Sequence, residues 1–131
     1  MLAELRDAHN RLLAGIQELE DAAKADAPDP SLLATIRWRL SRASSHRRKL
    51  VDEASAQLLE QAPAAASQIG RLRENNAEML FASSRHVGGW PIARITGDWD
   101  GYRLASAEMR KSMRTRIGLE QAILYPLLEA N

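Results

Sequence analysis

One row near the C-terminal end of this chain carries side chains that can do chemistry. Four side chains are separated by steps of four, three and four residues: Arg116, Glu120, Ile123 and Leu127. Such steps place all four on one face of an α-helix. The two apolar members indicate that this face is buried, so a carboxylate and a guanidinium lie among core side chains. A buried carboxylate can hold a metal ion or a cation, and a guanidinium can hold an anion.

Three other segments each carry one polar residue where the apolar periodicity predicts burial. These residues are His9, Arg47 and Asn76. In a bundle of helices of similar length, such positions meet at one level, and carboxylate-bridged metal sites are built from His and Glu in this way. We therefore expect the three side chains to meet Arg116 and Glu120 inside the protein.

Four helices must position these residues, and proline or glycine separates them. We expect helices over residues 2–25, 31–60, 64–87 and 98–129, with a break before the last one near Gly97 and Gly101. Pro28 stops the first helix, Ser31 is expected to cap the second, and Gly88-Gly89 is expected to end the third in a left-handed conformation. Short connections make neighbouring helices antiparallel. The predicted fold is all-α, an up-and-down four-helix bundle that forms a single domain over residues 1–131.

Composition excludes several functional classes. The chain is 45% hydrophobic and 27% charged, with a formal net charge of +1 and no cysteine. Disulfides, thiolate metal sites and cysteine catalysis are therefore excluded, and the balanced charge gives no drive toward nucleic acid. No apolar run approaches the length of a bilayer, and the acidic amphipathic start does not resemble a signal peptide. We expect no membrane partner, a cytoplasmic location and no enzymatic activity.

Several short motifs together resemble the hemerythrin-like (HHE cation-binding) family. Asp7-Ala-His9 is similar to the family's first-helix His motif, and Glu74-Asn-Asn76 is similar to its third-helix Glu-His. The segment from Arg116 to Glu120 stands for its last His-x-x-x-Glu pair, and Leu124-Tyr-Pro-Leu-Leu128 matches its aromatic-Pro tail. The resemblance implies a hemerythrin-like bundle with a di-iron site at these positions: His9, Arg47, Val51, Asn76, Arg116 and Glu120.

Only two of the six positions, His9 and Glu120, keep a residue type that the family uses as a ligand. Arginine has no lone pair to give and is always charged. We therefore expect a vestigial site without metal or other cofactor. The protein is expected to act as a binding or regulatory module for a protein or small-anion ligand. The alternative is a functional non-haem iron, oxygen-binding protein with a di-iron cofactor.

Other residues support further hypotheses. His46, followed by Lys49, is similar to the active segment of histidine phosphotransfer bundles, which gives a signalling alternative. Trp38 is predicted on the outer face of its helix, where it is expected to contribute to a homodimer or partner contact. His86 lies beside a helix end and is expected to be a cation there. The basic residues of 31–50 spread round their helix, so a nucleic-acid partner is not expected.

Overall fold

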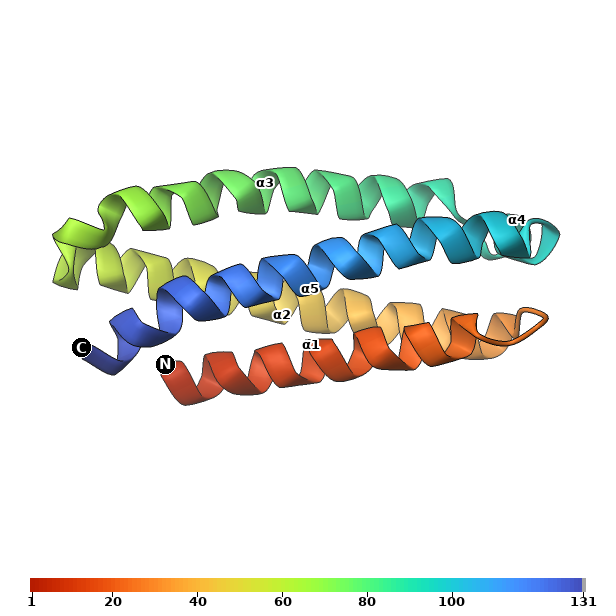
Figure 1. Ribbon diagram of the computed structural model, residues 1–131, viewed down its shortest axis with the longest axis horizontal. Coiled ribbons are helices and arrows are strands. Elements are labelled where there is room, and N and C mark those ends of the chain that lie inside the picture. The colour runs from red at the N-terminus through yellow and green to blue at the C-terminus, as the bar shows by residue number, and fades with distance from the viewer. Residues whose placement is uncertain (131) are drawn as a thin grey trace.

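The computed structural model describes residues 1–130, and every regular element within them is helical. In chain order the elements are α1 (Leu2–Ala23), α2 (Pro30–Gln61), the 3₁₀ helix η1 (Pro63–Ala65), α3 (Ala66–Gly89), α4 (Ile92–Gly97) and α5 (Trp99–Ala130). The all-α prediction is therefore confirmed. Figure 1 shows α1, α2, α3 and α5 side by side along the long axis, with consecutive long helices running in opposite directions.

Two apolar clusters fill the space between the helices, one toward each end. The first cluster contains Leu12, Ile16, Leu19, Leu33, Ile36, Leu40, Trp90, Ile95, Trp99, Tyr102 and Ile117. The second contains Leu5, Ala8, Leu50, Val51, Leu58, Ala65, Ile69, Leu72 and Leu124. Along α1 and α2 the clusters are separated by a buried polar residue, His9 and Arg47 respectively. A polar layer thus lies between the two apolar clusters.

The start of α2 differs from the prediction. The helix begins one residue earlier, at Pro30, and Asp29 caps it, not Ser31. The Asp29 carboxylate accepts the backbone N–H of Leu32 at 3.1 Å. Proline suits the first helical position because it has no N–H to leave unpaired there. The cap therefore falls on the residue before Pro30.

The end of α3 also differs from the prediction. The helix continues through Gly88 and Gly89, and no described residue has a positive φ. The left-handed glycine cap expected at this end was therefore wrong. The chain turns instead at Trp90, whose side chain is buried, immediately before Pro91. Proline disfavours helical backbone in the residue before it, so α3 stops there.

The expected break before the last helix is confirmed, at Asp98 between α4 and α5. The Asp98 carboxylate accepts the backbone N–H of Gly101 at 3.0 Å, which caps α5. A Cβ built on Gly101 would lie 2.3 Å from an Asp98 oxygen. Glycine is needed here because it leaves room for the capping side chain.

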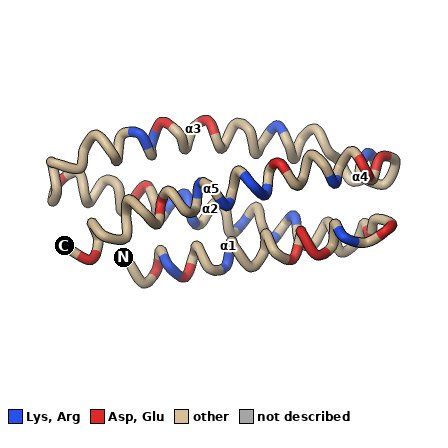
Figure 2. Tube along the Cα trace, in the orientation of Figure 1, with Lys and Arg blue, Asp and Glu red and all other residues tan. Residues whose placement is uncertain are grey.

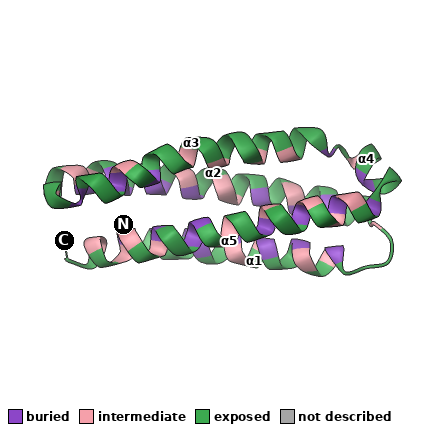
Figure 3. Ribbon diagram, turned by 45° about the horizontal axis from the view of Figure 1, so that its top comes forward, coloured by how far each residue is buried: buried purple, intermediate pink, exposed green. Residues whose placement is uncertain are grey.

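Only the first part of α3 is buried. Ile69 and Leu72 are its buried residues, whereas Leu80, Phe81 and Val87 are exposed. Figure 3 shows this as a mostly exposed helix. The second half of α3 therefore lies mostly outside the core. This half of α3 instead borders a cavity, described below.

None of the helices within residues 1–130 combines the length and the apolarity needed to span a lipid bilayer.

Candidate functional site

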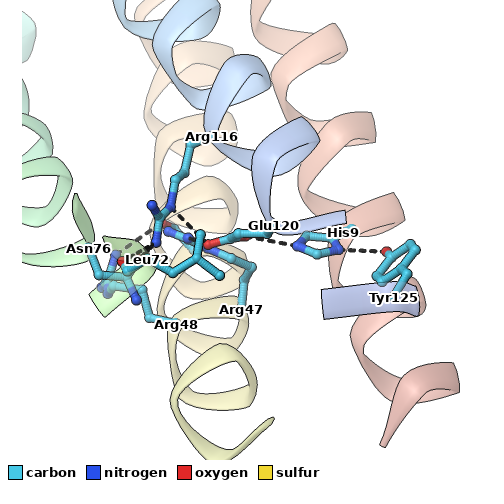
Figure 4. A network of polar contacts seen from close by, with 9 residues as sticks. His9, Arg47, Arg48, Leu72, Asn76, Arg116, Glu120 and Tyr125 are labelled. Atoms are coloured by element: carbon cyan, nitrogen blue, oxygen red, sulfur yellow. Dashed lines mark hydrogen bonds and ion pairs between the residues drawn. The ribbon is translucent and has the colours of Figure 1, made fainter. Parts of the chain in front are cut away.

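Glu120 is the centre of the polar layer. Its side chain is fully buried, and both carboxylate oxygens have partners. One oxygen, Oε2, accepts from Arg47 Nη1 at 2.5 Å and from Arg116 Nε at 3.0 Å. The other, Oε1, lies 2.9 Å from His9 Nε2. Figure 4 shows this carboxylate between the two arginines on one side and the imidazole on the other. Glu120 therefore joins α1, α2 and α5.

Arg116 extends the layer to the fourth long helix. Because it precedes Glu120 by four residues on α5, its Nε reaches the carboxylate within one helix face. Its Nη2 donates to the Leu72 carbonyl at 2.6 Å and to the Asn76 side-chain oxygen at 2.7 Å, both on α3. The helical periodicity predicted the Asn76 position. A backbone acceptor such as Leu72 leaves no signal in the sequence.

Tyr125 completes the network on the side of α1. Its hydroxyl lies 2.6 Å from Nδ1 of the buried His9. When Nε2–H of His9 donates to Glu120, Nδ1 accepts the Tyr125 hydroxyl proton. Burial raises the pKa of Tyr125, which keeps this proton in place. Sequence reasoning noted Tyr125 only as part of an aromatic-Pro pair, because it lies off the row that contains Glu120.

The charges of the layer do not cancel. Burial alone would raise the pKa of Glu120, but the hydrogen bond from His9 and the charges of Arg47 and Arg116 lower it. Burial lowers the pKa of Arg116, whereas the negative charge of Glu120 raises it. Two guanidinium groups and one carboxylate leave one positive charge when the imidazole is neutral. Arg47 Nε and Arg116 Nη1 are also buried without hydrogen-bond partners.

The sixth predicted site residue, Val51, lies outside the network. It is fully buried in the second apolar cluster, where it packs with residues such as Leu50 and Leu58. Its placement at the site depended on the family resemblance alone. The apolar side chain is part of the core beside the layer.

The donors of the layer do not fit a di-iron centre. They consist of one imidazole and one carboxylate, both already bonded to each other, and two guanidinium groups that repel cations. Within the described part of the chain, no three His, Cys, Asp or Glu side chains are grouped so that they could hold a metal ion. The void beside Arg47 and Arg116 measures about 10 Å³, room for about one water molecule. Neither arginine turns outward, because both are buried.

The remaining candidate residues lie away from the layer. His46 is exposed on α2. Trp38 is 61% exposed, with the Arg42 guanidinium 5.0 Å from its ring centroid, so it lies on the outer face as predicted. His86 is half-buried and stacks on Tyr102. Burial and the charge of Arg37 lower the pKa of His86. The expected helix-end cation is therefore corrected, because this environment favours neutral imidazole.

Charge is spread over the described helices. Figure 2 shows acidic and basic residues at intervals along α1, α3 and α5. Surface ion pairs cross between helices, for example Arg6 with Glu129 at 2.9 Å and Arg114 with Glu20 at 3.1 Å. These contacts are exposed or half-buried, unlike the layer around Glu120.

No family model matches the chain, and neither the curated proteins nor the solved structures contain a match to it.

Proposed function

We propose that this chain is an up-and-down four-helix bundle of the hemerythrin type in which a salt-bridged layer replaces the di-iron centre. It acts as a binding or regulatory module and not as an enzyme. The observation that carries the proposal is the position of Glu120, which receives Arg47, Arg116 and His9 from three helices. All four stand at positions that the family resemblance assigns to ligands.

The charge of the layer supports this replacement. A buried carboxylate needs positive charge nearby, because an unpaired charge in the interior costs several kcal/mol. A metal ion could supply that charge, and here Arg47 and Arg116 supply it. Their hydrogen bonds also link α2 and α3 to α5. A bridging metal would link helices in the same way.

The closed geometry supports a role without catalysis. Glu120 and His9 are fully buried, and each of their hydrogen-bonding atoms has a protein partner. A general acid or base must reach the proton of a substrate. The void beside the arginines, about 10 Å³, has no space for one. Ligand binding must therefore take place elsewhere on the molecule.

Metal analysis tests the proposal. Protein purified without chelator, and again after incubation with ferrous iron, is expected to contain far less than one metal ion per chain. Stoichiometric iron, manganese or zinc in the purified protein would refute the replacement.

Restoring the ligands tests the register. The combined changes Arg47→His, Val51→Glu, Asn76→His and Arg116→His are expected to create iron binding, seen in the absorption spectrum. The matched control adds Glu120→Ala to these four changes and is expected to lose that binding. A folded fourfold variant that ignores iron would show that these residues do not stand at ligand positions.

One observation favours a second candidate function. His46 is exposed on α2 and Lys49, one turn later, is exposed as well, as phosphotransfer through a histidine requires. Incubation with radiolabelled acetyl phosphate separates the two functions. The binding-module proposal predicts no acid-labile label on the protein. Label that is present on the native chain and absent from His46→Ala would favour phosphotransfer.

A further inference from the structure

A cavity of about 430 Å³ lies between α2, α3 and α5. This volume is within the usual range for small-molecule sites. Its apolar lining includes Leu19, Leu40, Leu80, Val87, Met109 and Met113. Leu80 and Val87 are seven residues apart on α3, so they share one face of the helix. Their row therefore faces this cavity, and the space is not filled by other parts of the described chain.

Three arginines line the same cavity, and no acidic residue does. They are Arg37, Arg48 and Arg110. None of the three is within ion-pair distance of a carboxylate belonging to residues 1–130. Their recorded hydrogen bonds go to neutral oxygens: Val87 O, the hydroxyls of Ser44 and Ser45, and the hydroxyl of Ser106. The cavity is thus positively charged and lacks a counter-charge at its surface.

Arg110 is the most confined of these cations. It is 7% exposed, and its Nε has no hydrogen-bond partner. Burial lowers the pKa of Arg110, while Glu20 acts in the opposite direction from a distance. The Glu20 carboxylate is itself hydrogen-bonded to Arg114. A buried guanidinium group without a carboxylate partner costs stability, so Arg110 is suited to an anion brought by a ligand.

Tyr102 supplies a second donor at the cavity wall. The residue is fully buried, and its hydroxyl makes no well-formed hydrogen bond with any described residue, although the Ser106 hydroxyl is close enough to lower its pKa. Burial raises the pKa of Tyr102, so the hydroxyl keeps its proton. The ring is held by Trp90, Trp99 and His86 at centroid distances of 5.6, 6.0 and 6.0 Å. This donor is rigidly placed, and a carboxylate oxygen would satisfy it.

We propose that this cavity binds an organic carboxylate with an apolar body. The carboxylate would accept hydrogen bonds from Arg110 and Tyr102, and the apolar body would lie against Met109 and Met113. Methionine side chains adapt to varied apolar shapes, which suits such a site. An inorganic anion has no apolar group to place against this wall, and a neutral ligand leaves the arginines without a counter-charge.

The inference names a ligand class for the binding role proposed above, and in that respect it rests on the proposed function. The two proposals nevertheless fail separately. Metal analysis tests the layer around Glu120, whereas titration with an anion tests the cavity. The void at the layer shares Ser44, Arg48, Leu80, Ser83 and Met113 with the cavity. It measures only about 10 Å³, so the probes named below do not fit it.

Isothermal titration calorimetry tests the proposal with a small panel of probes. The acids are 4-phenylbutyrate, octanoate and 1-naphthoate, and the comparison compounds are 4-phenylbutanol, acetate and inorganic phosphate. At least one of the acids is expected to bind with a Kd of about 1 mM or tighter. The alcohol, acetate and phosphate are expected to bind at least about tenfold more weakly, because each lacks either the charge or the apolar body.

Substitutions at the cavity complete the test. Arg110→Met is expected to raise the Kd of the tightest-binding acid by about tenfold or more. Methionine resembles the arginine side chain in shape but lacks its charge. The matched control, Arg103→Met on the same helix, changes an exposed pair with Asp100 and should leave the Kd unchanged. Binding of no acid, equal binding of alcohol and acid, or an Arg110→Met variant with native affinity would each overturn the proposal.

Discussion

Two groups of arginines in this protein differ in what balances their charge. Arg47 and Arg116 share the Glu120 carboxylate inside the core, where the space beside them measures about 10 Å³. Arg48 and Arg110 line a cavity of about 430 Å³ and are bonded only to serine hydroxyls. The two groups are adjacent on α2, since Arg47 and Arg48 follow each other. The first group has its counter-charge within the chain, and the second group has no carboxylate of residues 1–130 within ion-pair distance.

This difference indicates that the counter-charge of a buried arginine decides whether it has a structural role or can bind a ligand. A buried cation with its own carboxylate is fixed in one geometry and cannot recruit a ligand. A buried cation without one gains from any anion that fits. The layer around Glu120 therefore joins the helices, and we propose the cavity as the place for binding. The following predictions test each half of that contrast, starting with the largest effect.

Glu120→Gln is expected to lower the free energy of unfolding by about 3–5 kcal/mol, because it leaves two buried guanidinium groups without a counter-charge. Chemical denaturation measures this loss. The matched control is Glu129→Gln on the same helix, which removes an exposed pair with Arg6. The control should cost no more than about 1 kcal/mol. Equal losses of unfolding free energy in the two variants would show that the buried layer stabilises the protein no more than an exposed ion pair does.

The stability of the native protein is expected to fall in acid through Glu120. The pKa of Glu120 is lowered below its usual 4.5 in the folded state. Its contribution is therefore complete above pH 4.5 and is lost as the pH falls through the lower folded value. Unfolding free energies measured from neutral to acid pH should fall steeply in the native protein and less steeply in Glu120→Gln. A native slope that survives Glu120→Gln unchanged would contradict this assignment.

Tyr125→Phe is expected to lower the free energy of unfolding by about 1 kcal/mol, because His9 Nδ1 loses its hydrogen-bond partner while the ring packing is kept. The measurement is again chemical denaturation. A matched comparison is Tyr102→Phe, because the Tyr102 hydroxyl lies near Ser106 but makes no well-formed hydrogen bond within the described chain. Tyr102→Phe should not destabilise the protein, and a larger loss there than at Tyr125 would reverse the contrast.

Arg110→Met is expected to have only a small effect on stability. The substitution removes a buried cation that has no carboxylate of the described chain within ion-pair distance. The free energy of unfolding should therefore rise, or fall by no more than about 0.5 kcal/mol. Denaturation without added anion measures it. A loss as large as that of Glu120→Gln would show that Arg110 is fixed within the chain and is not open to a ligand.

The polar layer could be predicted because burial follows helical spacing. His9, Arg47, Asn76, Arg116 and Glu120 each stand where an apolar residue would continue a row, and the structure brings all five together. The long helices also begin and end within two residues of their predicted limits. The hemerythrin resemblance itself stays a prediction.

Other features were not accessible from the sequence, for different physical reasons. The contacts of Tyr125 and of the Leu72 carbonyl depend on how the helices are rotated and how far apart they lie. The spacing of residues along one helix does not specify either quantity. Val51 was assigned by resemblance, although its apolar side chain was the better guide to its place in the core. The Asp29 cap had a signal that was overlooked, because Pro30 favours the first helical position. The cavity could not be predicted, because it depends on the distance between helices. The spacing of Leu80 and Val87 along α3 does not specify how far this helix lies from its neighbours.

A double-mutant cycle between Glu120 and Arg116 measures most directly whether the chain supplies its own counter-charge. Unfolding free energies of the native protein, Glu120→Gln, Arg116→Met and the double variant should give a coupling energy of about 1.5–3 kcal/mol, as for hydrogen bonds to charged groups in the interior. The same cycle for the half-buried pair of Glu20 and Arg114 should give about 0.2–1 kcal/mol. A Glu120–Arg116 coupling no larger than that of the Glu20–Arg114 pair would contradict the central role of Glu120.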